Sequence, residues 1–323
     1  MKTTIKCVLA LCIAALPGLA ASQAAPWPSK PIKAVVPFPA GAATDILARL
    51  VLERVSKQLG QPIIVENKPG AGGTIGEAAV AQADPDGYTI MVHSNSHTLT
   101  PWTYKNLSYN AARDFVGVIP LASVPMAIVT SVDKRWSAPS DLVRAAKANP
   151  GSINYSSSGA GGATHLGAER FRLAGGFTAT HIPYKGSAEA LREVLAGRVD
   201  FHVAPLGLVV PHLRAGKLIA LASTSSKRSS ALPSVQTTVE AGLANSQYDV
   251  WIGMFAPAKT PRAIINRLNE EAAKAIRTPE VKERFASMVM DEMLMSVDEF
   301  GDFLKADFET NRLLVKATGI EPN

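Results

Sequence analysis

The chain has 323 residues, enough for two domains of ordinary size, with 47% hydrophobic and 19% charged residues. This balance excludes a disordered chain and predicts packed globular domains. The formal net charge of +6 is spread without a long run of like charges, so it predicts no nucleic-acid surface.

Residues 1–24 predict a cleavable secretory signal peptide, and therefore a periplasmic protein. Lys2 and Lys6 precede an apolar stretch of about ten residues, too short to span a bilayer, and small residues follow. A permanently anchored N-terminal helix is the alternative. Both cysteines, Cys7 and Cys12, lie in this segment, and neither follows a small residue. We therefore expect no lipid anchor, disulfide or thiol chemistry in the mature protein.

Apolar runs alternate with helix-like segments along the chain. The spacing predicts strands over residues 31–38, 62–65, 88–93, 153–156, 177–182, 199–203, 217–223 and 250–256. It predicts helices over residues 44–59, 75–83, 139–148, 163–173, 187–196, 261–277, 279–290 and 297–318. Strands that alternate with helices favour parallel sheets covered by helices.

This order predicts an α/β fold of two lobes, each a mostly parallel sheet flanked by helices. The helical C-terminal end suggests that the chain returns to the first lobe, with crossings near residues 120–130 and 225–250. We assign residues 25–122 and 226–323 to lobe 1 and residues 123–225 to lobe 2.

Three loops of small residues, at positions 37–45, 66–74 and 155–164, each join a predicted strand to a predicted helix. The free N–H groups at a helix start bind anions, and the hydroxyls of the third loop could hold a carboxylate without a formal positive charge. The alternative is structural: a tight turn in the second loop and helix capping by Asp45. If the third loop lies in lobe 2, the loops face each other across a cleft.

No motif predicts a cofactor, a metal ion or catalysis. The phosphate-binding string is absent, and Thr164 breaks the dinucleotide spacing that begins at Gly159. His93 and His97 lack the adjacent glutamate of zinc proteases, and residues 156–158 lack the nucleophile elbow of serine hydrolases. We expect the histidines to be packed or surface residues.

Several strings resemble the substrate-binding proteins of tripartite tricarboxylate transporters, also called Bug proteins. They are PIKAVVPFPAGAATDILARL, VENKPGAGGTIG, ADPDGYTI, INYSSSGAGGATHL, THIPYKGSAEAL, AGKLIALA, PSVQTTVEAGL and WIGMFAPAKTP, in this order from residue 31 onward. The resemblance implies a type II periplasmic binding fold that closes on a small carboxylate, and delivery of that ligand to a large and a small membrane subunit. It implies a binding protein and not an enzyme, and we expect a monomer.

The resemblance also implies which residues bind the ligand. They are Phe38, Gly41, Thr44 and Asp45 in the first loop, Ser156, Ser158, Gly159 and Thr164 in the third, and His181, Pro183 and Tyr184 before the YKG string. Ser94 and Asn95, after the strand over 88–93, are further candidates. The first loop departs from the family at Ala42, where a second glycine is usual, and its methyl group could narrow the site.

Two other functions stay open, a periplasmic sensor or scavenger that presents its ligand to a signalling receptor and a secreted hydrolase of carboxylate esters. The resemblance does not name the ligand, because di- and tricarboxylates, amino acids and aromatic acids all occur in the family. The first and third loops hold no Arg or Lys. Selectivity is therefore expected from the cleft shape and from apolar residues such as Phe38 and Trp251. The alternative for Trp251 is a buried aromatic residue at the lobe junction.

Overall fold

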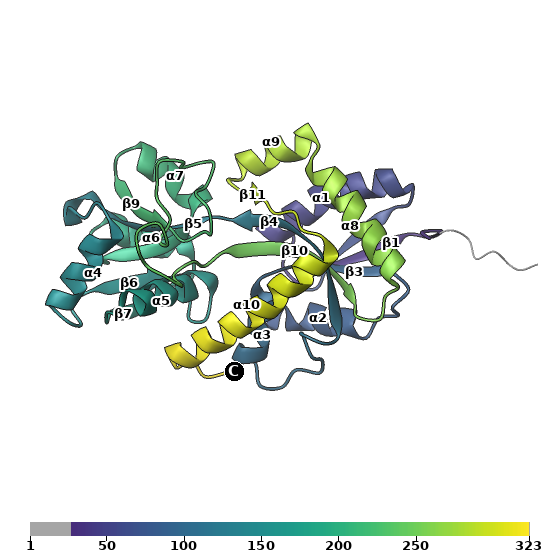
Figure 1. The fold of residues 1–323 in the computed structure, drawn as a ribbon, viewed down its shortest axis with the longest axis horizontal. Helices are drawn as coiled ribbons and strands as arrows, with labels where there is room; N and C mark the ends of the chain where they lie inside the picture. Colours follow the sequence, from purple (N-terminus) through teal and green to yellow (C-terminus); the bar gives the residue numbers. More distant parts are fainter. Residues whose placement is uncertain (1–26, 323) are drawn as a thin grey trace, which may run out of the picture.

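The computed structural model describes residues 27–322, so the predicted signal peptide over residues 1–24 lies outside the described residues. Two lobes lie side by side, with the N-terminal strands on the right of Figure 1 and the middle of the chain on the left. Over residues 27–322, no helix combines the length and the apolar character needed to cross a membrane.

Lobe 1 is built on a six-stranded sheet. Its strands are β1 (Ile32–Val36), β2 (Ile63–Asn67), β3 (Thr89–Ser94), β4 (Phe115–Val124), β10 (Val250–Pro257) and β11 (Asp291–Glu292). They lie in the order β11-β4-β10-β3-β1-β2. β1 pairs in parallel with β2 and β3, whereas β10 runs antiparallel to β3 and β4.

Lobe 2 is built on a five-stranded sheet. Its strands are β5 (Met126–Ser131), β6 (Asn154–Ser157), β7 (Thr180–Pro183), β8 (Phe201–Pro205) and β9 (Leu218–Ser223). They lie in the order β7-β6-β8-β5-β9. β6 pairs in parallel with β7 and β8, whereas β5 runs antiparallel to β8 and β9.

Helices connect and cover these strands. They are α1 (Ala43–Leu59), α2 (Thr74–Ala81), α3 (Ser96–Thr103), α4 (Pro139–Ala148), α5 (Ala163–Gly175), α6 (Ser187–Leu195), α7 (Leu206–Arg214), α8 (Arg262–Ile276), α9 (Pro279–Ser287) and α10 (Val297–Thr318), with short 3₁₀ turns at Ala71–Gly73 and Val132–Lys134. α1 ends at Gly60, whose left-handed φ of 67° favours glycine at a helix C-terminus.

The predicted two-lobed α/β fold is confirmed, with one correction to its sheets. The strands that carry the chain between the lobes, β4, β5 and β10, pair antiparallel with their neighbours. Each sheet is therefore mixed rather than mostly parallel. The parallel strands β1, β2 and β3, and β6, β7 and β8, keep their carboxyl ends together, which is where the candidate loops lie.

The chain crosses from lobe 1 to lobe 2 at Pro125, between β4 and β5, and returns just before β10. Residues 226–249, which the sequence assigned to lobe 1, contact lobe 2, because Thr237 bridges to Ser223 of β9 and Tyr248 belongs to the apolar core of lobe 2. We therefore propose lobe boundaries at residues 125 and 249.

α10 joins the lobes a third time. Near its start Phe300 packs with Trp251 beside the lobe 1 sheet, and near its end Leu314 and Val315 belong to the core of lobe 2. Figure 1 shows this helix in yellow, reaching from one lobe to the other. The lobe junction therefore consists of two chain crossings and one helix that spans both cores.

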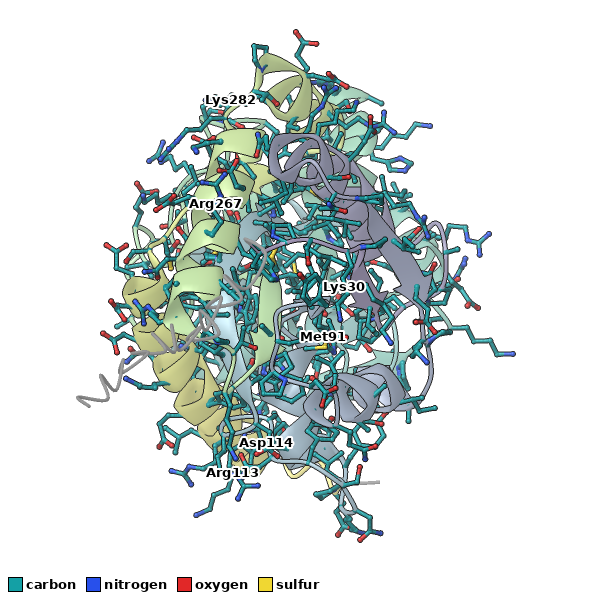
Figure 2. The ribbon with its side chains drawn as sticks, turned by 90° about the vertical axis from the view of Figure 1, so that its right-hand side faces the viewer. Lys30, Met91, Arg113, Asp114, Arg267 and Lys282 are labelled. Carbon is teal, nitrogen blue, oxygen red and sulfur yellow. The ribbon has the colours of Figure 1, made fainter. Side chains whose placement is uncertain are left out.

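Apolar side chains cover both faces of the lobe 1 sheet. Along β1, Ile32, Ala34 and Val36 pack under α1 and α8, while Val35 points to the opposite face with Met91. In Figure 2, Met91 lies in the middle of the molecule, and the charged Lys282 and Arg113 lie at its rim. Trp251 is fully buried, which supports its interpretation as a buried aromatic residue and removes it from the predicted cleft wall.

Candidate functional site: a cleft between the two lobes

In lobe 1 the first and second loops follow neighbouring parallel strands and are bonded together. The side-chain amide of Asn67, at the end of β2, donates to the carbonyl of Phe38 at 3.0 Å and to Oδ1 of Asp45 at 2.8 Å. The Phe38 ring meets the imidazole of His93, on β3, edge to face with centroids 5.2 Å apart. The loops after β1 and β2 and the end of β3 thus form one surface.

Asp45 shapes the first loop. Its carboxylate accepts hydrogen bonds from the Gly41 N–H at 2.8 Å and from Nε of Arg49 at 3.0 Å. Burial opposes ionisation of this side chain, but the hydrogen bonds from Arg49, Gly41 and Asn67 outweigh it and lower the pKa of Asp45. Both carboxylate oxygens are engaged within lobe 1, but they accept from the loop and from neighbouring side chains and not from the free N–H groups of α1, so Asp45 does not cap this helix.

α1 begins directly after this loop. Its N-cap, Ala42, supplies no side-chain hydrogen bond, and within residues 27–322 the N–H groups of Ala43 and Thr44 have no acceptor. Ala42 has extended backbone angles (φ −65°, ψ 156°), so its side chain is accommodated without strain. Ala42 in place of the usual second glycine thus leaves the start of α1 intact, with the ionised Asp45 carboxylate in its first turn offsetting part of the positive charge.

The second loop requires glycine for close packing. Gly73 has φ 108°, and a methyl group there would lie 2.6 Å from Nε2 of the buried His93. At Gly72, with φ 65°, a methyl group would lie 2.7 Å from Oη of Tyr104. Both positions combine a left-handed backbone with a near neighbour. The tight-turn interpretation of this loop therefore holds.

In lobe 2 the third loop is held by its own hydroxyl groups. The Ser158 N–H donates to Oγ1 of Thr164 at 2.8 Å, and the two hydroxyl oxygens lie 2.9 Å apart. The Gly162 N–H donates to the carbonyl of Gly159 at 3.4 Å. α5 begins at once after this turn without a side-chain cap. Ser158, Gly159 and Thr164 are thus brought together at a helix start that can accept an anion.

Ser156 lies away from this helix start. Its side chain is fully buried, and its hydroxyl donates to the carbonyl of Ala190 on α6 at 3.2 Å. Successive side chains of a strand point to opposite faces, so Ser156 on β6 packs toward α6. The hydroxyl of Ser94, also predicted in the site, donates to the hydroxyl of Ser96 at 3.1 Å within its own turn.

His181 is packed beneath the third loop. Its Nε2 lies 2.6 Å from Oγ of Ser157, and its ring stacks on Tyr155 and on His165 with centroids 5.0 and 3.8 Å away. Burial lowers the pKa of His181. The neighbouring Tyr184 donates its N–H to the carbonyl of Ser157 at 3.0 Å.

The Ser157–His181 contact resembles a nucleophile beside a base. Ser157, however, is fully buried, and its hydroxyl also donates to the carbonyl of Gly159. A nucleophile must reach its substrate, so this geometry supports a structural role for the pair. Pro183, paired opposite Ser157 at the end of β7, completes the predicted segment.

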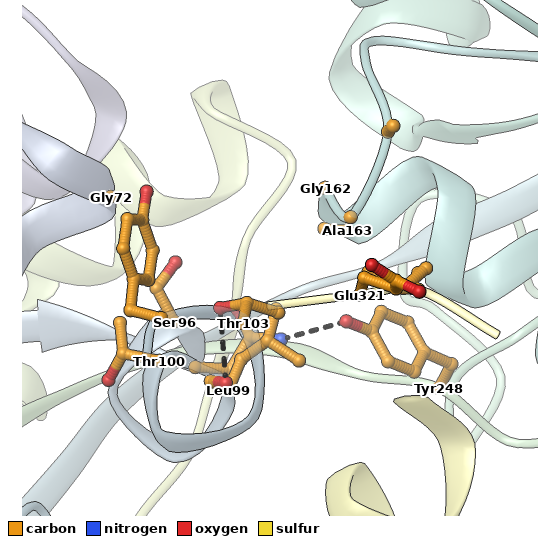
Figure 3. A pocket seen from close by; sticks show the side chains of 14 residues that line it. Gly72, Ser96, Leu99, Thr100, Thr103, Gly162, Ala163, Tyr248 and Glu321 are labelled. Atoms are coloured by element: carbon orange, nitrogen blue, oxygen red, sulfur yellow. Dashed lines mark hydrogen bonds between the residues drawn. The ribbon is translucent and has the colours of Figure 1, made fainter. Parts of the chain in front are cut away.

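A pocket of about 470 Å³ lies between the lobes. Gly72 and α3 line it from lobe 1, residues 160–163 line it from lobe 2, and Tyr248 lines it at the lobe junction. Figure 3 shows Gly162 and Ala163 facing Ser96 and Thr100 across the gap. The second and third loops therefore face each other across this pocket, whereas the first loop, which was expected to face the third as well, supplies none of its described lining residues. Of the predicted site residues, Asn95 lines this pocket.

Most of the pocket wall was not predicted from the sequence: it consists of Leu99, Thr100 and Thr103 on α3, Tyr104 after it, and Tyr248. The small polar run Ser94-Asn95-Ser96, directly after a buried strand, signals the start of α3. Tyr248 follows a long irregular segment, and its sequence neighbours carry no comparable signal.

The chain matches the family described as "Tripartite tricarboxylate transporter family receptor" over residues 47–320. It is 33% identical to Protein BugT of Bordetella pertussis over 319 residues, which cover 98% of each chain. It is 35% identical to the "UPF0065 protein in tcbD-tcbE intergenic region" of Pseudomonas sp. strain P51 over 290 residues, which cover 90% of this chain and 86% of that one.

Three solved structures share its fold along nearly their whole length. A TctC solute-binding protein from Polaromonas has a TM-score of 0.83 and 28% identity, covering 90% of this chain and 99% of that one. The R. palustris protein Rpa4515 with adipate has a TM-score of 0.74 and 31% identity, and the match covers 92% of this chain and 100% of that one. MatC of Rhodopseudomonas palustris with bound malate has a TM-score of 0.70 and 28% identity, covering 90% and 100%.

Proposed function

Because the chain belongs to the tripartite tricarboxylate transporter receptor family, we propose that it captures a small carboxylate between its lobes and presents it to a tripartite transporter. It binds and releases the ligand without changing it. The proposal includes export to the periplasm through a signal peptide over residues 1–24, action as a monomer, and delivery to a large and a small membrane subunit.

The observation that carries this proposal is the pocket between the lobes, which ends at the uncapped start of α5. Unpaired backbone N–H groups and the helix dipole favour an anion at this point. Since residues 160–163 belong to lobe 2 and α3 to lobe 1, a ligand in the pocket contacts both lobes. Such a ligand stabilises the arrangement in which the lobes lie closest.

We propose a site made of both helix starts. Phe38, Gly41 and Thr44 form the edge of lobe 1 near α1, with Ser94 and Asn95 at the start of α3, and Ser158, Gly159 and Thr164 form the edge of lobe 2. Asp45, His181, Pro183 and Tyr184 hold these loops in place, and Ser156 serves the packing of lobe 2. The adipate and malate in the two related structures support a carboxylate as the ligand class.

Thermal unfolding of the chain from residue 25 onward, freed of co-purified ligand by unfolding and refolding, tests the proposal. The panel contains aliphatic, amino and aromatic carboxylates, with sugars and amino-acid amides as controls. A ligand at 100 times its dissociation constant adds about 2.7 kcal/mol of stability. A shift with one carboxylate class supports the proposal, whereas shifts with sugars alone contradict it. Uptake of that ligand is then compared between cells that contain the protein and cells that lack it. Loss of uptake without the protein indicates transport, and unchanged uptake indicates sensing.

A further inference from the structure

The charge of the pocket between the lobes is unusual for a site that holds several carboxylates. The ionisable side chains that line it are those of Tyr104, Tyr248 and Glu321; no Lys, Arg or His is among the described lining residues. A second or third carboxylate of a ligand would enter without a cationic side chain and with Glu321 nearby. Burying an unpaired charge is unfavourable, and the carboxylate of Glu321, which is an exposed residue, adds a repulsion that water partly screens.

Tyr248 offers a hydrogen-bond donor to this pocket. Tyr248 is 5% exposed, and its Oη accepts a hydrogen bond from Nδ2 of Asn95 at 3.3 Å, drawn as the dashed line that ends at Tyr248 in Figure 3. Burial raises the pKa of Tyr248, so the hydroxyl keeps its proton. Within residues 27–322 that proton has no acceptor, which leaves it available to a ligand oxygen.

Asn95 offers the complementary acceptor. The residue is 5% exposed and lines the pocket, and its side-chain N–H group already donates to Tyr248. In the described part of the chain, Oδ1 of Asn95 accepts no hydrogen bond from another residue. An amide oxygen that reaches the pocket without a partner in the protein can accept a hydrogen bond from a ligand or from water. The pocket thus presents a donor and an acceptor at adjacent positions.

The remaining wall is apolar. Leu99 and Ile320 contribute aliphatic side chains, and Tyr104 lies against the second loop at Gly72. Figure 3 places Glu321 on the same side of the pocket as Tyr248 and Ala163. An anion-accepting helix start, a phenol donor, an amide acceptor and one carboxylate therefore adjoin an apolar surface.

Resting on the proposed function, we propose that this pocket recognises an amino carboxylate with an apolar side chain. The ligand carboxylate lies at the start of α5 beside the Tyr248 hydroxyl. The ligand ammonium group donates to Oδ1 of Asn95 and faces Glu321, while the side chain packs on Leu99 and Tyr104. This ligand class differs from adipate and malate, which carry two carboxylates and no ammonium group.

Matched ligand pairs test the ammonium group alone. Calorimetric titration of the ligand-free protein compares leucine with 4-methylpentanoate and phenylalanine with 3-phenylpropanoate, beside succinate, adipate and citrate. We expect the better amino acid to bind at least tenfold more tightly than its desamino partner and than any di- or tricarboxylate. Equal or tighter binding of the desamino acids or of the polycarboxylates overturns this inference but leaves the proposed function standing. Binding of no carboxylate at all overturns both.

Variants at the pocket test the assigned roles. Glu321→Gln should weaken binding of the amino acid about two- to fivefold and leave binding of its desamino partner unchanged, because the lost charge faces the ammonium group from an exposed position. Glu283→Gln, on α9 away from the pocket, is the matched control and should alter neither. Tyr248→Phe should lower the affinity for both ligands of a matched pair about equally, by about tenfold, because both lose the hydrogen bond from the phenol. A Glu321→Gln protein that retains the full preference for the amino acid contradicts the assignment.

Discussion

The imidazole rings of His165 and His181 stack face to face, with centroids 3.8 Å apart and planes 7° from parallel. His165 also accepts the Gly161 N–H at Nδ1, so the stack supports the third loop from below. Burial, followed by the nearby His181, lowers the pKa of His165 to about 4. Two like charges at this distance would repel, so the stack requires neutral rings.

Stability should therefore fall in mild acid. Burial also lowers the pKa of His93 and of His202 to about 4, against about 6.5 in an unfolded chain. Between these values the unfolded state binds more protons, so stability is complete above about pH 6.5 and is lost as the pH falls toward 4. At pH 5 each of these two fully buried rings should cost about 2 kcal/mol.

Urea unfolding at pH 7 and pH 5 measures this loss. The variant His165→Asn, which keeps an acceptor near the Gly161 N–H, should lose less stability between the two pH values than the unaltered protein. His212→Asn, at the end of α7, should behave like the unaltered protein. Stability that stays constant or increases toward pH 5 would show that the buried rings are not held neutral.

Proline can remove one helix-start N–H without breaking the helix. Ala43 and Ala163 are the first residues of α1 and α5, and the residues before them have extended angles that proline tolerates. Ala163→Pro should weaken carboxylate binding by about 1–3 kcal/mol, because it removes a donor to a charged group. The same measurement on Ala43→Pro shows whether the start of α1 contributes as much to ligand affinity as the start of α5.

Calorimetric titration gives these affinities, and thermal unfolding confirms that both helices persist. If both proline variants bind the ligand with full affinity, neither helix start belongs to the binding site.

Glycine substitutions separate backbone strain from crowding. Gly60→Ala should cost about 1 kcal/mol, since its φ is 67° and a methyl group there meets nothing within 4 Å. Gly73→Ala should cost at least about 1 kcal/mol more, because its methyl group also collides with His93. Chemical denaturation compares the two. Equal losses would show that the second loop has room for a side chain.

Serine and threonine variants separate the fold from the site in lobe 2. Ser156→Ala should lower stability by about 1 kcal/mol, through loss of the hydrogen bond to Ala190, and leave ligand affinity unchanged. Thr164→Ala should weaken binding, because Oγ1 of Thr164 orients Ser158 at the helix start. Calorimetric titration gives the ligand affinity of both variants, and unfolding gives their stability. A weaker affinity in Ser156→Ala would show that Ser156 also contributes to the binding site.

Local patterns predicted most of the fold. Helices α4 and α10 begin and end where the sequence places them, because a proline or a capping serine marks the start and the apolar spacing marks the length. The strands β4 and β5 were not predicted. Their apolar runs are typical of buried strands and were overlooked, whereas their antiparallel pairing with distant segments leaves no local signal.

The candidate site was predicted less completely than the fold. The loops were found because glycine and small residues identify helix starts, and Asn95 was found because it follows a buried strand. Side-chain direction was not predictable: Ser156 and Ser158 are two residues apart, yet the first packs on α6 and the second on Thr164. Tyr248 enters the pocket only because residues 226–249 fold back on lobe 2.

The most direct test is a crystal structure of the refolded protein with the carboxylate that stabilises it most in the thermal panel. We predict ligand density between the lobes, with a carboxylate oxygen within hydrogen-bonding distance of the Ala163 N–H and the other near the Tyr248 hydroxyl. Ligand density outside this cleft, for example in the groove between α5 and α10, would contradict capture between the lobes.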